Sequence, residues 1–164
     1  MTGSACLIVP SRTGHVVAGE VLRYGRLGME TGGFLLAPHG TSSVSVVAFV
    51  GMSGVVRSRF RLQISDLALD QLFGFAEQQQ CWIPAQFHSH ADLAFLSQTD
   101  REHGLRVQGF VSAVIPDFAA PPRHVTDWSW WCFDTDDWLT TCSPSTGHGR
   151  LRQVIFDEDG VRDS

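Results

Sequence analysis

Two histidines, a serine and an aspartate lie close together in this sequence and could bind a divalent metal. His88 and His90 flank Ser89, and after six further residues the chain reads Ser97-Gln98-Thr99-Asp100. Two imidazoles and one carboxylate give three protein ligands and leave a fourth position for water, which is typical of a catalytic zinc site. We therefore expect His88, His90 and Asp100 to bind one Zn²⁺ ion.

The local sequence predicts how these side chains come together. Residues 81–87 are apolar and predict a buried strand that ends at the histidines. Side chains two positions apart in a strand share a face, so His88 and His90 lie side by side and Ser89 faces away. Ser97 is typical of a helix N-cap, with Asp100 in the first turn, and a loop that folds back would bring Asp100 to the histidines.

Each half of this pattern has a simpler interpretation. Ser97 and Asp100 alone are typical of an ordinary helix start. A lone H-x-H is more often a strand with two hydrogen-bonded histidines than a pair of ligands. The combination at this spacing is what favours a metal site.

Together these residues resemble the JAMM metalloproteases, also called JAB or MPN-plus domains. The family signature is a distant glutamate, then H-[ST]-H and S-x-x-D, and His88-Ser89-His90 and Ser97-x-x-Asp100 match the last two parts. The segment Glu30-Thr31-Gly32-Gly33-Phe34-Leu35-Leu36 is similar to the family's E-x-G-G-x-L-L. The gap before Ser97 is one residue shorter than usual, and Ala91 stands where proline is common.

The resemblance implies a layered α/β fold. It is a mixed β-sheet flanked by helices, the MPN/JAB fold, which is similar to that of cytidine deaminases. We expect a single domain over residues 1–164, with a core at about 5–135 and a C-terminal extension at 136–164. Residues 51–61 and 116–127 are short where larger eukaryotic members carry insertions, which predicts a minimal, prokaryotic-type domain.

The resemblance also implies a role for each site residue. His88, His90 and Asp100 would hold zinc with water in the fourth position, and zinc lowers the pKa of that water from about 15.7 towards 7. Glu30 would act as general base and then as general acid, a contribution of about 10²–10⁴ in rate. Ser97 would donate a hydrogen bond to the oxyanion. Without the metal motif, Glu30 would read as a surface carboxylate at a strand start.

The implied function is that of a zinc-dependent isopeptidase or peptidase. It would cleave after the Gly-rich C-terminal tail of a ubiquitin-like protein, as a deubiquitinase-like enzyme or in maturation of the modifier. Bacterial ubiquitin-like conjugation and antiphage systems contain similar domains. A hydrolase that releases an amino acid from the tail of a sulfur-carrier protein stays open, as does a non-catalytic MPN scaffold.

Two other enzyme classes share part of the pattern. Two histidines and a carboxylate also form the facial triad of non-haem iron oxygenases, but the expected helices fit a β-barrel poorly. Zinc deaminases require H-x-E and P-C-x-x-C, and neither motif occurs in this chain.

Composition narrows the setting. The net charge of −5 argues against nucleic-acid binding. No apolar run reaches the length of a membrane span, and no signal peptide is evident. The four cysteines are scattered without a C-x-x-C motif, so we expect neither a zinc ribbon nor a disulfide framework, and a reduced, cytoplasmic setting.

Periodicity and turn residues predict the remaining elements. Helices are expected at residues 13–24, 65–79 and 99–107, and strands at 32–36, 43–50, 110–115, 124–133 and 153–156. Arg57, Arg59 and Arg61 alternate along the chain and indicate an exposed strand edge with charges that discourage aggregation. The aromatic run at residues 128–133 favours core packing, with a hydrophobic shelf for a partner as the alternative.

Overall fold

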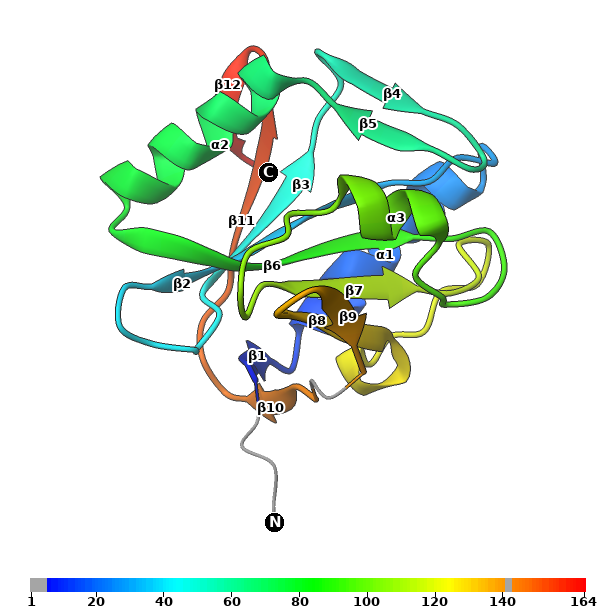
Figure 1. Ribbon diagram of the computed structural model, residues 1–164. Helices are drawn as coiled ribbons and strands as arrows, with labels where there is room; N and C mark the ends of the chain where they lie inside the picture. The colour runs from blue at the N-terminus through cyan, green and yellow to red at the C-terminus, as the bar shows by residue number, and fades with distance from the viewer. Residues whose placement is uncertain (1–5, 141–142) are drawn as a thin grey trace.

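In residues 6–140 and 143–164, which the computed structural model describes, an eight-stranded mixed sheet forms the centre of the molecule (Figure 1). Its strand order is β12-β11-β3-β2-β6-β7-β8-β9. The elements in chain order are β1 Ile8–Pro10, α1 Thr13–Gly25, β2 Gly32–Pro38, β3 Val46–Val50, β4 Val55–Arg57, β5 Leu62–Ile64, α2 Asp66–Gln78, β6 Cys81–Ser89, α3 Gln98–His103, β7 Val111–Ile115, a 3₁₀ turn Val125–Asp127, β8 Ser129–Asp134, β9 Asp137–Leu139, β10 Ser145–Gly147, β11 Arg152–Asp157 and β12 Gly160–Asp163.

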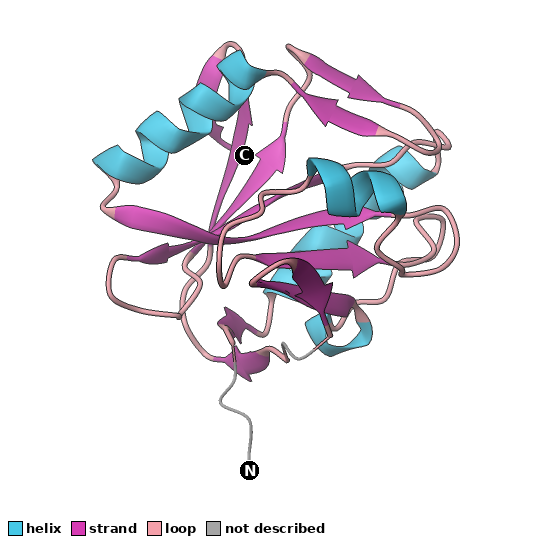
Figure 2. Ribbon diagram, viewed as in Figure 1, coloured by secondary structure: helices cyan, strands magenta, loops and turns pink. Residues whose placement is uncertain are grey.

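Helices cover both faces of this sheet (Figure 2), so the layered α/β class is confirmed. Strand β2 is buried on both sides, and its side chains alternate between two cores. Leu35 shares one core with Val21 of α1. Phe34 and Leu36 share the other with Leu72 of α2. The alternation along β2 and the helical periodicity of α1 and α2 therefore bring apolar side chains into the same two cores.

Strands β2 and β6 leave no room for a side chain at Gly32, where they carry the site. Gly32 lies opposite His88 in the antiparallel register. A side-chain carbon at Gly32 would overlap the backbone oxygen of Phe87 and the side chain of Leu62. Glycine is needed here because two backbones and the β4–β5 hairpin meet at one point.

We expect Gly32→Ala to lower the free energy of unfolding by about 1–3 kcal/mol, the usual cost of overpacking. Urea unfolding with zinc chelated would measure this. The matched control is Gly19→Ala on α1, because a side-chain carbon there meets nothing within 4 Å. Equal stability of the two variants would contradict the packing argument.

The third predicted helix is shorter than expected. α3 ends at His103, whereas the sequence predicts a helix to residue 107. Gly104 adopts an extended backbone and packs against the carbonyl of Asp100 and the ring of Trp138. That tertiary contact ends the helix.

The predicted strand at 124–133 is wrong in its first half. Residues Val125–Asp127 form a 3₁₀ turn, and β8 begins at Ser129. The indole N–H of Trp130 donates to the Val125 carbonyl at 2.8 Å, which stabilises the turn. Trp128 and Trp130 are buried and stack with ring centroids 5.7 Å apart, so core packing is confirmed for these two.

The C-terminal segment is part of the sheet rather than an addition to it. β11 pairs in parallel with β3, and β12 forms the edge next to β11. Val154 and Phe156 of β11 are fully buried. A core that ended near residue 135 would therefore leave β3 paired with β2 alone.

The cysteines differ from the expectation of a wholly reduced chain. Cys6 is disulfide-bonded, whereas Cys81 and Cys132 are free. Spacing along the sequence does not predict which cysteines the fold brings within bonding distance. Within residues 6–140 and 143–164, every helix is too short or too polar to cross a bilayer.

Candidate metal centre

Strand β6 delivers the two histidines to one point. His88 lies in the strand and His90 follows it, and both are nearly buried. Ser89 points the other way, where its hydroxyl accepts the N–H of Thr31 at 2.9 Å. The Ser89 N–H donates in turn to the Thr31 carbonyl at 2.9 Å. This pairing with the Thr31 backbone fixes the alternation that places both imidazoles on one face.

Three donor atoms converge beside this face. The Nε2 atoms of His88 and His90 are 3.1 Å apart. The Oδ2 atom of Asp100 lies 3.2 Å from the first and 3.3 Å from the second. Neighbouring ligands of a tetrahedral zinc ion with bonds of about 2.0–2.1 Å are separated by roughly 3.3 Å. The three side chains therefore fit one zinc ion with a fourth position left over.

The hydrogen bonding of His90 suits a metal ligand. Its Nδ1 atom lies 3.1 Å from the carbonyl oxygen of Leu93. A carbonyl only accepts, so Nδ1 carries a hydrogen and Nε2 is the nitrogen that could bind a metal. The ring of Phe95 packs edge-on against His90 with centroids 5.0 Å apart, which limits rotation of the imidazole.

Asp100 is oriented by the first turn of α3. Ser97 and Asp100 form a capping box, in which the Ser97 hydroxyl accepts the Asp100 N–H at 3.1 Å and Asp100 Oδ2 accepts the Ser97 N–H at 3.0 Å. The simpler interpretation of this pair is confirmed, and the same oxygen also faces both histidines. Burial disfavours the carboxylate, but hydrogen bonds from His88 and His90 outweigh it and hold the pKa of Asp100 well below its usual range.

Glu30 lies beside this cluster. The register that pairs Gly32 with His88 carries on through the Thr31–Ser89 bonds, so Glu30 comes opposite His90. Its backbone N–H donates to the Ser58 carbonyl at 2.8 Å. The residue is 7% exposed. Burial raises the pKa of the Glu30 carboxyl to about 7, against an opposing pull from His90.

The Ser97 hydroxyl group can both accept and donate a hydrogen bond. In the cap its oxygen accepts a hydrogen bond, so the hydroxyl hydrogen remains able to donate. The hydroxyl also forms a hydrogen bond with the Asp100 carboxylate, which helps to lower the pKa of Asp100, so Ser97 stabilises both α3 and this carboxylate.

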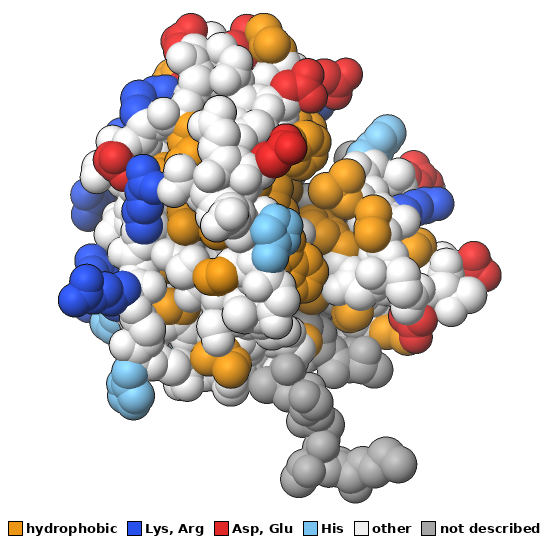
Figure 3. Space-filling view, turned by 90° about the vertical axis from the view of Figure 1, so that its left-hand side faces the viewer, with side chains coloured by type: hydrophobic (Ala, Val, Ile, Leu, Met, Phe, Trp, Pro, Cys, Tyr) orange, Lys and Arg blue, Asp and Glu red, His pale blue; other side chains and the backbone are white. Residues whose placement is uncertain are grey.

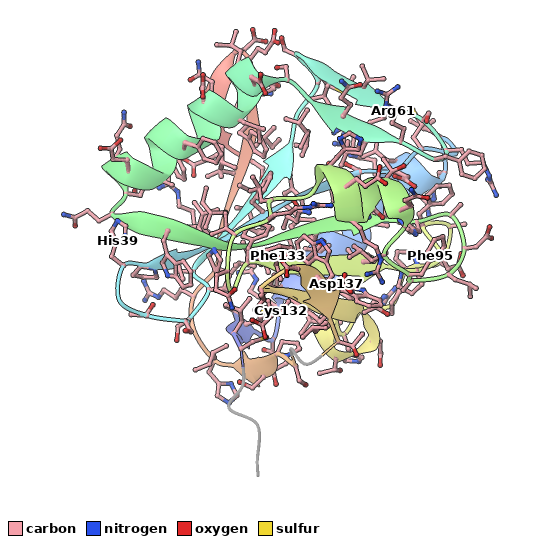
Figure 4. The ribbon with its side chains drawn as sticks, in the orientation of Figure 1. His39, Arg61, Phe95, Cys132, Phe133 and Asp137 are labelled. Carbon is pink, nitrogen blue, oxygen red and sulfur yellow. The ribbon has the colours of Figure 1, made fainter. Side chains whose placement is uncertain are left out.

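A groove of about 390 Å³ leads away from the cluster. β5 forms one wall, α3 and the residues after it form the other, and β2 and β6 form the floor. His88 and Asp100 are among its lining residues, and so is the exposed His103. Figure 4 shows Arg61 on the hairpin above α3 and Phe95 on the loop beside it. The face turned towards the viewer in Figure 3 is hollowed and has apolar side chains along the hollow.

Several residues that support the centre were not predicted from the sequence. The Leu93 carbonyl and the Phe95 ring, which hold His90, lie in a loop whose conformation carries no periodic signal. Thr31 supports Ser89, and only its position beside Glu30 and Gly32 could have drawn attention to it. Arg57 donates to the Thr31 hydroxyl at 3.3 Å, which alternation alone did not indicate.

The raised pKa of Glu30 predicts a pH-dependent stability. The group has a pKa of about 7 in the folded protein against 4.5 ordinarily. Its ionisation therefore costs nothing below about pH 4.5 and destabilises the fold increasingly up to about pH 7. We expect metal-free Glu30→Gln to exceed the wild type in unfolding free energy by about 1–3 kcal/mol at pH 8 and by much less at pH 4.5. Denaturant titrations with a chelator would measure this, and a pH-independent difference would contradict it.

Comparisons with known proteins give the fold alone. The chain matches no protein-family model, and no curated protein matches it. Among solved structures, it is similar to the solution structure of protein DSY2949 from Desulfitobacterium hafniense, a structural genomics target. The TM-score is 0.63 at 12% identity, over 91% of this chain and 94% of that chain.

Proposed function

We propose that this protein is a zinc-dependent peptidase or isopeptidase of the JAMM type, with an MPN-like fold. Its substrate would be a ubiquitin-like protein, cut after a Gly-rich C-terminal tail. The observation that carries the proposal is the convergence of three zinc-type donor atoms, 3.1–3.3 Å apart, beside a groove and a buried glutamate.

His88, His90 and Asp100 would hold the metal. A bound zinc ion would supply a Lewis acid and a water molecule of lowered pKa. A carboxyl group with a pKa near neutrality is suited to take up and return a proton at that pH. Glu30 would take a proton from the attacking water and later give it to the leaving amine. The Ser97 hydroxyl would donate to the oxyanion that develops on the scissile carbonyl.

The groove suits an extended chain. β5 pairs with β4 on one side, and its residues line the groove on the other. An extended tail could add to this edge with backbone hydrogen bonds, the mode by which many domains bind strands. Glycine at the cut position would pass the narrow space between β5, His88 and α3. We further propose a cytoplasmic setting, in which reducing conditions would keep the Cys6 disulfide open.

The experiment is cleavage of ubiquitin-like proteins fused through a Gly-Gly tail to a reporter. We expect the purified protein to cut directly after the tail, to lose this activity with a chelator and to regain it with zinc. Mass spectrometry of the products would locate the cut.

The matched control for loss of a ligand is a histidine away from the site. His39 lies in the turn after β2, far from the centre (Figure 4). His39→Ala should retain cleavage, and His88→Ala should not. Unaltered function after His88→Ala, in a protein that binds no zinc, would favour the non-catalytic scaffold instead.

A further inference from the structure

Arg57 occupies a position that differs from its neighbours Arg59 and Arg61. All three were expected on an exposed edge, and the other two are exposed. Arg57 is half-buried and turns inward beneath the β4–β5 hairpin. Within the described part of the chain it forms no ion pair with a carboxylate, so uncharged groups must stabilise its charge.

The guanidinium group of Arg57 joins three separate segments. Its two terminal nitrogens donate to the carbonyls of Val50 at 2.6 Å and Gly51 at 2.7 Å, at the end of β3. Its Nε donates to the Thr31 hydroxyl at 3.3 Å. The group also lies 4.1 Å above the ring of Tyr24 at the end of α1. A planar fork with several fixed donors is suited to such a junction, and a lysine is not.

These contacts surround the Glu30 backbone. Next to Arg57, the Ser58 carbonyl accepts the Glu30 N–H at 2.8 Å. On the other side, Thr31 is held by both Arg57 and Ser89. Glu30 is therefore clamped between the hairpin that walls the groove and the strand that carries the histidines.

We infer that Arg57 is a positioning residue that fixes Glu30 against the metal centre through Thr31 and the hairpin. This inference rests on the proposed function for its catalytic consequence, but the clamp itself does not. A displacement of about 1 Å in a reacting group can cost about 100-fold in rate. Arg57 touches none of the three zinc-type donors, so its loss should change turnover and leave metal binding intact.

The test compares Arg57→Met with Arg23→Met. Arg23 is exposed; it also stacks on Tyr24, at 4.9 Å, and pairs with Glu20, but it has no contact with Thr31 or the β3 carbonyls. We expect Arg57→Met to speed amide exchange at Glu30 by about tenfold or more relative to Val114, a buried reference in β7. We expect kcat to fall by about 10–100-fold with the zinc content unchanged. Arg23→Met should match the wild type in all three.

Two further variants protect the test against misfolding. Thr31→Val removes only the hydroxyl that accepts from Arg57 and should show the same change in smaller degree. Arg57→Lys keeps the charge and single donors but not the fork, so its turnover should lie between that of Arg57→Met and that of the wild type. Exchange at Glu30 that is equal in all variants, or zinc loss in proportion to activity, would overturn the inference. A wild-type protein that cleaves no fusion would contradict the proposed function. The comparison of amide exchange at Glu30 would still decide whether Arg57 holds Glu30 in place.

Discussion

Replacing Glu30 by glutamine is expected to lower kcat by about 10²–10⁴ while the protein still binds one zinc ion. Glu30 lies opposite His90, but the capping box, His88 and His90 hold Asp100 without it. The amide has the shape of the carboxyl and cannot take up a proton at neutral pH. Steady-state cleavage of a Gly-Gly fusion, together with metal analysis of the same sample, would measure both effects.

Glu77→Gln is the matched control for this change. Glu77 lies exposed on α2, away from the groove. It should leave both turnover and zinc content unchanged. Parallel loss of zinc and activity in Glu30→Gln would make Glu30 a ligand and contradict the division of roles between it and Asp100.

Replacing Asp100 by asparagine is expected to weaken zinc binding by more than about 100-fold, and to lower activity with it. The loss of zinc affinity should exceed the roughly 10–100-fold that is usual for residues that only hydrogen-bond to metal ligands. The reason is that a charged donor 3.2 Å and 3.3 Å from the two imidazoles is removed. Asparagine can still accept the Ser97 N–H, so α3 should remain capped. Competition with a chromophoric chelator would give the affinity.

The control for Asp100→Asn is Asp70→Asn on the exposed side of α2. It carries the same change of charge far from the donor atoms. Equal zinc affinity in the two variants would place the metal elsewhere. A large loss of helix content in Asp100→Asn alone would instead show that the capping box, rather than the ligand, is what the substitution removes.

The predictable parts of the fold were those with strong local signals. The apolar period of α1, the Ser65 cap of α2 and the β-branched strands β3 and β7 all have their own sequence patterns. The parts that failed depend on contacts distant in sequence. Gly104 ends α3 against Trp138. Leu67 and Phe73 of α2 are apolar yet 52% and 43% exposed, because Ala68 and Ala76 are the residues buried against the sheet.

The candidate site was predictable from residue types and their spacing. Side chains at positions i and i+2 of a strand point to the same face, and a capped helix start fixes the direction of the side chains in the first turn. The structure brings His88, His90 and Asp100 together and places Glu30 beside them. The supporting contacts were not predictable. The Leu93 carbonyl, the Phe95 ring and the Arg57 fork reach the site through loop geometry, which no local pattern encodes.

Zinc K-edge X-ray absorption of the protein loaded with one equivalent of zinc tests the metal centre most directly. We expect four nitrogen or oxygen ligands at about 2.0–2.1 Å, with scattering from two imidazoles. His88→Ala should remove one imidazole, and His39→Ala should remove none. Sulfur ligands at about 2.3 Å, or a spectrum that is the same in His88→Ala as in the wild type, would contradict a site built from His88, His90 and Asp100.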